Sequence, residues 1–178
     1  MSPNNAKPWT LTHLLPERLG AAALAGLGAY MMVTAIGVAV TAALWLILNP
    51  LTPPGTPMTQ LPAYAMTVPF HPLMNLLVWP FFAAVYLSRS NAGFREAVKL
   101  GAFWLVATVA IDLVGWVIVR RPWSMTAREF YVGYQPWISF IYLVIFASPL
   151  LAQLWLRRSR ARNLYHRTGR DQARGVAR

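Results

Sequence analysis

Four long apolar runs, separated by polar or proline-rich segments, dominate the pattern of this chain. They cover about residues 21–48, 71–88, 100–119 and 137–156. An apolar helix of roughly 17–25 residues crosses the hydrocarbon core of a bilayer, where a helix satisfies its own backbone hydrogen bonds. We therefore predict an all-α fold, an integral membrane bundle of four transmembrane helices, with residues 21–156 as the transmembrane domain.

Prolines are expected to shape two of the spans and the first connection. Pro80 lies near the middle of the second span, and Pro149 lies in the fourth. Because proline lacks an amide hydrogen and crowds the preceding turn, an interior proline bends a helix. The sequence therefore predicts kinks in spans two and four. The connection 49–72 holds seven prolines and no charged residue, and we expect a loop there rather than a fifth span.

The two ends of the chain are polar. Residues 1–20 are expected to form a cytoplasmic N-terminal segment. Residues 157–178 form a basic cytoplasmic tail without apolar periodicity, for which we expect partial disorder or adhesion to the membrane surface. A signal peptide is the competing interpretation of the first apolar run, but its 28 residues exceed the usual apolar region of about 7–15. We expect it to be retained as the first span.

Composition supports a membrane protein and narrows the chemistry. Hydrophobic residues make up 57% of the chain and charged residues 12%, against about half and about a quarter in soluble domains. The chain has no cysteine, which excludes thiol chemistry, disulfides and cysteine-ligated metals. No glycine-rich phosphate loop or HExxH pair is present, and we expect neither a metal nor another cofactor.

The distribution of basic residues predicts the orientation. Of the sixteen lysines and arginines, thirteen lie in segments that share one side of the membrane if both termini are cytoplasmic, and three lie opposite. Cytoplasmic segments carry the excess of positive charge. We therefore expect four spans with both termini cytoplasmic, in a membrane of the bacterial cytoplasmic type. The basic tail lacks the interleaved aromatic residues of a nucleic-acid surface, so membrane lipids are the expected partner rather than nucleic acid.

Asp112 is the candidate around which a functional site is predicted. It is the one charged residue in the third span, and a carboxylate in hydrocarbon costs roughly 2.5–3.5 kcal/mol on insertion scales. It therefore needs hydrogen-bonding partners inside the bundle. Comparison of depths at about 1.5 Å per residue places six polar side chains near it: Asn75, Tyr142, His71, Thr108, Ser139 and Thr41.

Three interpretations of Asp112 stay open. It could fasten helices through hydrogen bonds to Asn75 or Tyr142, it could handle a proton, a cation or a ligand, or it could extend towards Arg120 or Arg121. A Ser–His–Asp grouping of Asp112 with His71 and a serine has no motif behind it. These features favour a non-enzymatic accessory subunit, or a component that binds a lipid or small ligand in the outer half of the bilayer. The alternative is a small transporter-like or catalytic protein that uses Asp112 as a proton-titrating group.

Two further features carry alternatives. Arg120 and Arg121, with Arg128, either mark the membrane boundary or bind an anionic head group, since guanidinium groups match phosphate and carboxylate; Thr126 and Glu129 predict a helix-capping box beside them. Small residues also fall close to one face of the first span. That face serves either ordinary packing within the chain or a homodimer seam, and other membrane subunits are a further candidate class of partner for the chain. The small residues are Ala22, Gly26, Ala29, Val33 and Gly37.

Overall fold

A computed structural model describes residues 14–49, 51–53, 55–56, 60–89, 93–119 and 124–176, with side chains described between residues 18 and 162. Throughout these residues the regular structure is helical. Four helices are long and apolar enough to cross a membrane, as judged by length and composition, and they cover Arg18–Leu48, Pro62–Arg89, Phe94–Ile118 and Trp137–Arg162. The all-helical fold and the four apolar helices predicted from the sequence are thus confirmed.

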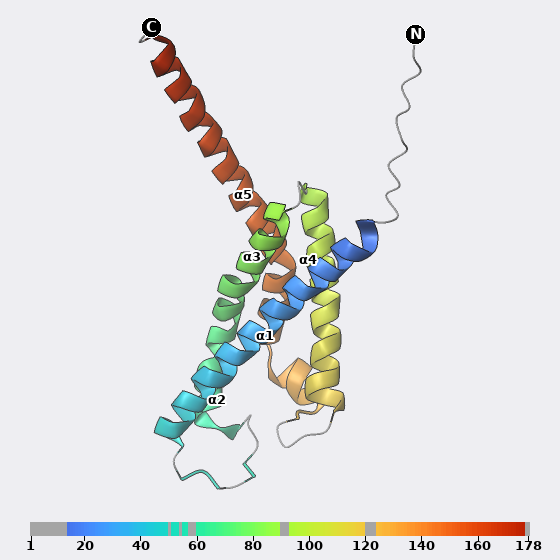
Figure 1. The fold of residues 1–178 in the computed structure, drawn as a ribbon. Helices are drawn as coiled ribbons and strands as arrows, with labels where there is room; N and C mark the ends of the chain where they lie inside the picture. The colour runs from blue at the N-terminus through green and yellow to red at the C-terminus, as the bar shows by residue number, and fades with distance from the viewer. Residues whose placement is uncertain are drawn as a thin grey trace.

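The helices form a bundle in which α5 occupies the centre. It packs against both α3 and α4, while α1 crosses the bundle obliquely and contacts mainly α3 (Figure 1). The first turns of α1 and the last turns of α5 lie at the same end of the molecule. The described elements are α1 Leu14–Leu48, α2 Pro62–Thr67, the 3-10 helix η3 Val68–Phe70, α3 His71–Arg89, α4 Phe94–Asp112, the π-helices η4 Leu113–Ile118 and η5 Glu129–Gly133, and α5 Trp137–Val176.

Helical structure extends further than the apolar pattern predicts. The apolar pattern indicates no helix after residue 156, whereas α5 continues without a break to Val176; the expected partial disorder or adhesion to the membrane surface stays a prediction. The tail has no proline and contains eight arginines and three alanines, two residue types with high helix propensity. Likewise α1 begins at Leu14, several residues before the predicted start of the first span.

The proline-rich connection also contains more helix than predicted. Residues 62–70 form α2 and η3, which lead directly into α3. Pro62 occupies the first turn of α2 and Pro69 the first turn of η3, where the missing amide hydrogen costs no intrahelical bond. The expectation of a loop through residue 72 is therefore wrong for this stretch. Pro80 and Pro149 lie inside α3 and α5, and the kinks stay a prediction.

A pair of tryptophans holds α1, α3 and α4 together. Trp79 and Trp104 are 2% and 1% exposed, and their ring centroids lie 5.2 Å apart. The indole nitrogen of Trp104 donates to the backbone carbonyl of Ala22 at 2.8 Å. A Cβ atom added at Gly26 would lie 2.6 Å from the same nitrogen. Ala22 and Gly26 therefore serve packing within the chain, which favours the first interpretation for this part of the small-residue face.

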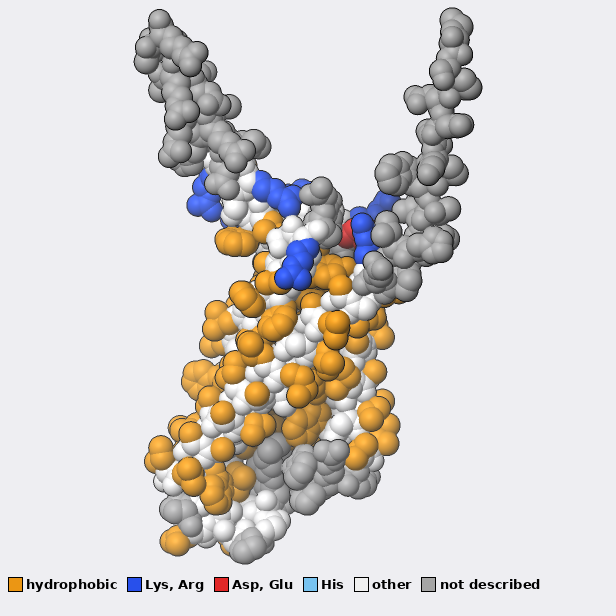
Figure 2. Space-filling model, viewed as in Figure 1, with side chains coloured by type: hydrophobic (Ala, Val, Ile, Leu, Met, Phe, Trp, Pro, Cys, Tyr) orange, Lys and Arg blue, Asp and Glu red, His pale blue; other side chains and the backbone are white. Residues whose placement is uncertain are grey.

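Charged side chains are segregated along the bundle. In Figure 2, lysine and arginine side chains gather at the end where α1 begins and α5 leaves the bundle, and hydrophobic side chains cover the surface below them. Arg128 and Glu129 lie at the opposite end, between α4 and α5. Arg120 and Arg121 lie outside the described residues. The candidate site lies in the half of the bundle that is further from the basic end.

Candidate functional site

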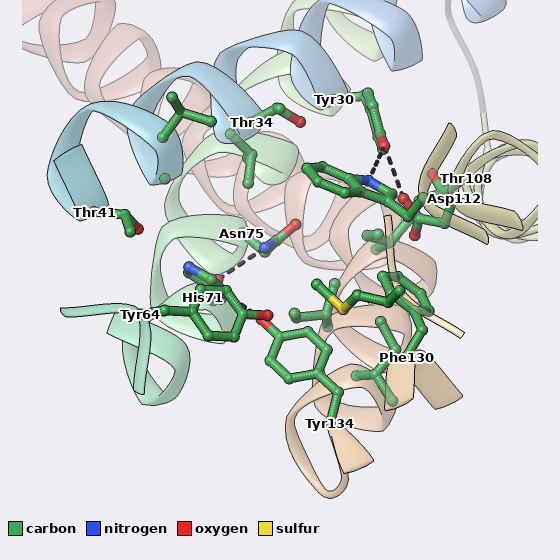
Figure 3. A pocket seen from close by; sticks show the side chains of 18 of the residues that line it. Tyr30, Thr34, Thr41, Tyr64, His71, Asn75, Thr108, Asp112, Phe130 and Tyr134 are labelled. Atoms are coloured by element: carbon green, nitrogen blue, oxygen red, sulfur yellow. Dashed lines mark hydrogen bonds between the residues drawn. The ribbon is translucent and has the colours of Figure 1, made fainter. Parts of the chain in front are cut away.

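A cavity of about 460 Å³ lies between α1, α3, α4 and the start of α5 (Figure 3). Most of its wall is aliphatic or aromatic, which is typical of a pocket for a small ligand. A few polar side chains project into it from different helices. They are Tyr30, Thr34 and Thr41 of α1, Tyr64 of α2, His71 and Asn75 of α3, Thr108 and Asp112 of α4, and Tyr134 before α5.

Asp112 forms a polar centre at one side of the cavity. It is the last residue of α4 and is 7% exposed. The hydroxyl of Tyr30 donates to its Oδ1 at 2.8 Å, and the hydroxyl of Tyr142 donates to its Oδ2 at 3.0 Å. Trp116 Nε1 in turn donates to the Tyr30 oxygen at 3.2 Å. One carboxylate thus ties α1 and α5 to α4.

The local structure around Asp112 places its neighbours on the cavity side. Thr108 lies one turn earlier on the same face of α4 and is buried. Directly after Asp112 the helix widens into the π-helix η4, a rare structure that often occurs at functional sites. The carbonyl of Trp116 in η4 accepts a hydrogen bond from the Met125 amide at 2.9 Å. Trp116 and Met125 both line the cavity.

A second polar group lies at the other side of the cavity. His71 Nδ1 and the Tyr134 hydroxyl share a hydrogen bond, and the Tyr64 ring lies beside both, with centroids 6.3 and 6.4 Å away. Figure 3 shows the three side chains directed towards one another from α2, α3 and the segment before α5. Burial raises the pKa of Tyr134 above its ordinary value, so its hydroxyl stays neutral and can both donate and accept.

Asn75 makes its hydrogen bonds to other residues of α3 and makes none to Asp112. Its Nδ2 donates to the His71 carbonyl at 2.8 Å, and its Oδ1 accepts from Trp79 Nε1 at 2.8 Å. Of the two alternative partners expected for Asp112, Tyr142 makes the hydrogen bond and Asn75 does not. The reason is geometric, because both partners of Asn75 lie within one turn of it on its own helix, and its hydrogen bonds are made before another helix is reached.

The predicted site residues are distributed as follows. The same cavity is lined by Asp112, Asn75, His71 and Thr108. Tyr142 does not line the cavity, but its hydroxyl donates a hydrogen bond to Asp112. Arg120 and Arg121 lie outside the described residues, whereas Arg128 is exposed.

The predicted capping box beside Arg128 is confirmed. Glu129 Oε2 accepts from the Thr126 amide at 2.7 Å, and the Glu129 amide donates back to Thr126 Oγ1 at 3.2 Å.

Tyr30 and Trp116 are two lining residues that were not predicted. Tyr30 and Trp116 lie inside apolar runs, where an aromatic residue does not stand out from its neighbours. The requirement that a buried carboxylate be hydrogen-bonded called for hydroxyl donors, yet only the relative rotation of the helices identifies Tyr30 among the tyrosines. Thr41, which shares a 3.1 Å hydrogen bond with Thr67, ties α1 to α2 at the cavity edge.

The chemistry available in this cavity is that of hydrogen bonding around a buried acid. In the described part of the chain, no group of three or more histidine, aspartate or glutamate side chains could hold a metal ion. Asp112 has no ion-pair partner among these residues, where Lys99 and Glu96 form the one salt bridge. No protein-family model, curated protein or solved structure matches the chain. The cavity is therefore the feature from which a function can be inferred.

Proposed function

We propose that this chain is an integral membrane protein that binds a small, mainly apolar ligand in the cavity beside Asp112. The observation that carries the proposal is the cavity itself. Its volume of about 460 Å³ falls in the range of roughly 300–1,000 Å³ typical of small-molecule sites. Its wall is largely apolar, and polar groups converge on it at two places, around Asp112 and around His71.

A substitution that fills the cavity tests this proposal. Gly37 lines the cavity, and a Cβ atom added there would meet only His71 Nε2, at 3.8 Å. Gly37→Phe should therefore place a ring in the ligand volume without displacing the backbone. The matched control is Gly20→Phe, because Gly20 lies in the same helix with nothing within 4 Å. Small apolar molecules that co-purify in mild detergent should be lost from Gly37→Phe alone; equal recovery from both variants would contradict the proposal.

The proposed topology has four spans with both termini cytoplasmic, in a cytoplasmic membrane of the bacterial type. Support comes from the thirteen-to-three distribution of basic residues and from the gathering of described basic side chains at one end. This orientation puts the cavity in the outer half of the bilayer. A reporter fused after Arg178 should be active only in the cytoplasm, and one inserted near Gly55 only outside; a cytoplasmic Gly55 reporter would overturn the orientation.

The proposed role is non-enzymatic, as an accessory subunit or ligand-binding component that has membrane lipids as partners and, in an accessory role, other membrane subunits. The support is the site itself, which offers hydrogen bonds but no activated nucleophile among the described residues. Purification in mild detergent, followed by identification of associated chains, tests this role. A stoichiometric membrane partner supports the accessory subunit, whereas homogeneous protein that moves protons in liposomes supports a transporter.

A second candidate function is proton handling by Asp112. The observation that favours it is a buried carboxylate with two tyrosine donors and no cation beside it in the described part of the chain. Asp112→Asn keeps the shape and one acceptor oxygen but cannot titrate. A stable, fully functional Asn variant would eliminate proton handling. A stable but inactive variant would eliminate a purely structural role for the acid.

A further inference from the structure

We infer that the ligand of this cavity is a lipophilic cation, a protonated amine that carries an apolar or aromatic body. This inference rests on the proposed function and deepens it by naming the class of ligand. It follows from the charge, the hydrogen-bonding capacity and the aromatic content of the wall around Asp112.

The cavity wall has one acidic side chain and lacks a lysine or arginine to pair with it in the described part of the chain. Among the described residues that line the cavity, Asp112 is the only carboxylate, and none is a lysine or an arginine. Its two direct partners are tyrosine hydroxyls, which donate hydrogen bonds but carry no charge. A buried carboxylate is expensive unless a counter-charge accompanies it. A cationic ligand would supply the charge that the described wall lacks.

The Asp112 carboxylate has hydrogen-bonding capacity that its two tyrosine partners do not use. A carboxylate offers about four lone-pair sites, two on each oxygen. Tyr30 occupies one site on Oδ1 and Tyr142 occupies one on Oδ2. Each oxygen can therefore accept one more hydrogen bond. An ammonium group can donate up to three, and hydrogen bonds between ionised partners are about twice as strong as those between neutral ones.

The cavity wall that includes Asp112 also contains aromatic and aliphatic side chains. Trp116, whose indole nitrogen binds Tyr30, brings an aromatic ring next to the acid. Aromatic faces attract organic cations, and the attraction grows when the cation is desolvated. The wall also includes aliphatic side chains, among them Ile138, Ile141 and Val33. The cavity thus combines an anionic, aromatic side with an apolar region, which matches the two parts of a hydrophobic amine.

The test compares two probes of nearly the same shape, 4-phenylbutylamine and 4-phenylbutan-1-ol, of which only the amine is charged at neutral pH. The full chain is reconstituted in nanodiscs of zwitterionic phosphatidylcholine, and binding is measured by calorimetry against empty nanodiscs. The variants are Asp112→Asn and, as a matched control for net charge, Glu96→Gln. Glu96 is exposed at the basic end of the bundle, where it pairs with Lys99 at 3.1 Å.

The wild type and Glu96→Gln should bind the amine about tenfold more tightly than the alcohol, as expected for a charge-assisted hydrogen bond. Asp112→Asn should lose this preference and retain the alcohol affinity. Equal binding of both probes to the wild type would overturn the cationic ligand and leave the proposed ligand site intact. Binding of neither probe, together with no effect of Gly37→Phe on co-purifying molecules, would remove the proposed function itself.

The comparison on the wild type does not depend on any variant folding. Should Asp112→Asn fail to fold, Tyr30→Phe provides the second variant, because it removes one donor and keeps the carboxylate. The preference for the amine should persist in Tyr30→Phe. Its disappearance there would assign the preference to the tyrosine and overturn the role of Asp112.

Discussion

Replacement of Gly101 by alanine should destabilise the bundle more than any other single methyl group added at a described glycine. Gly101 is buried in α4 and faces α5. A Cβ atom at this position would lie 2.3 Å from the backbone carbonyl oxygen of Phe146 and 3.2 Å from its carbonyl carbon. The obstacle is therefore the backbone of α5, which cannot move aside as a side chain can.

The geometry gives the magnitude. A carbon–oxygen contact settles at about 3.3 Å, so α4 and α5 would have to separate by roughly 1 Å at this point. Overpacking of this kind costs about 1–3 kcal/mol. Alanine is favoured over glycine inside a helix by up to about 1 kcal/mol, which offsets part of the cost. We expect a net loss of roughly 1–2 kcal/mol, because Leu100 and Trp104 beside Gly101 are buried too and leave little room for relaxation.

Thermal unfolding in mild detergent, followed by circular dichroism, measures the effect. Gly20→Ala is the matched control, since Gly20 is exposed in α1 with nothing within 4 Å. The control should unfold at the same temperature as the wild type or above it, because only the helix propensity changes. A Gly101→Ala variant as stable as Gly20→Ala would refute the close approach of α4 and α5.

Three further predictions concern other parts of the molecule. Trp104→Phe keeps an aromatic ring but removes the donor to the Ala22 carbonyl, and it should lower the free energy of unfolding by about 0.5–1.5 kcal/mol, measured by the same melts; an unchanged melt would contradict the role of that bond. Hydrogen bonds from the Thr126 amide and hydroxyl lower the pKa of Glu129, so the capping contribution is present above the ordinary glutamate pKa and is lost as pH falls through the lowered value. Thr126→Ala should raise the Glu129 pKa in an NMR titration, and an identical curve would count against the capping box. A peptide of residues 157–178 should bind anionic vesicles, by roughly 1 kcal/mol per basic residue near the surface, and dissociate at high salt; equal binding to neutral vesicles would exclude electrostatic adhesion.

The positions of the long helices were predictable because apolar runs of spanning length leave few alternatives to a helix. The need of Asp112 for hydroxyl donors was predictable too, since it follows from the cost of burying a carboxylate. Depth along the spans was enough to name Tyr142 as a partner of Asp112. When the directions of two spans are predicted, residue numbers tell which positions lie at the same depth. The same comparison also named Asn75, which the structure places on the cavity wall but bonds within α3.

What could not be predicted depends on rotation and on short-range chemistry. Tyr30 reaches Asp112 only because one face of α1 is turned towards α4, and nothing in an evenly apolar helix indicates which face that is. Helix α2 was missed because prolines suggest a loop, although the first turn of a helix accepts them. The helix after residue 156 was missed because the apolar pattern ends there, although arginine and alanine also have high helix propensity. In each case the deciding interaction is absent from the hydrophobic pattern.

The contact of Trp104 with the first turns of α1 has a consequence for genetics. Tyr30 lies eight residues after Ala22, roughly 12 Å along the helix, so the indole that holds Ala22 and abuts Gly26 also sets where the tyrosine hydroxyl stands. A selection for altered ligand preference should therefore return substitutions at Gly26, which does not itself line the cavity. Second-site suppressors of a larger residue at Gly26 should in turn concentrate at Trp104, where a smaller ring restores the space.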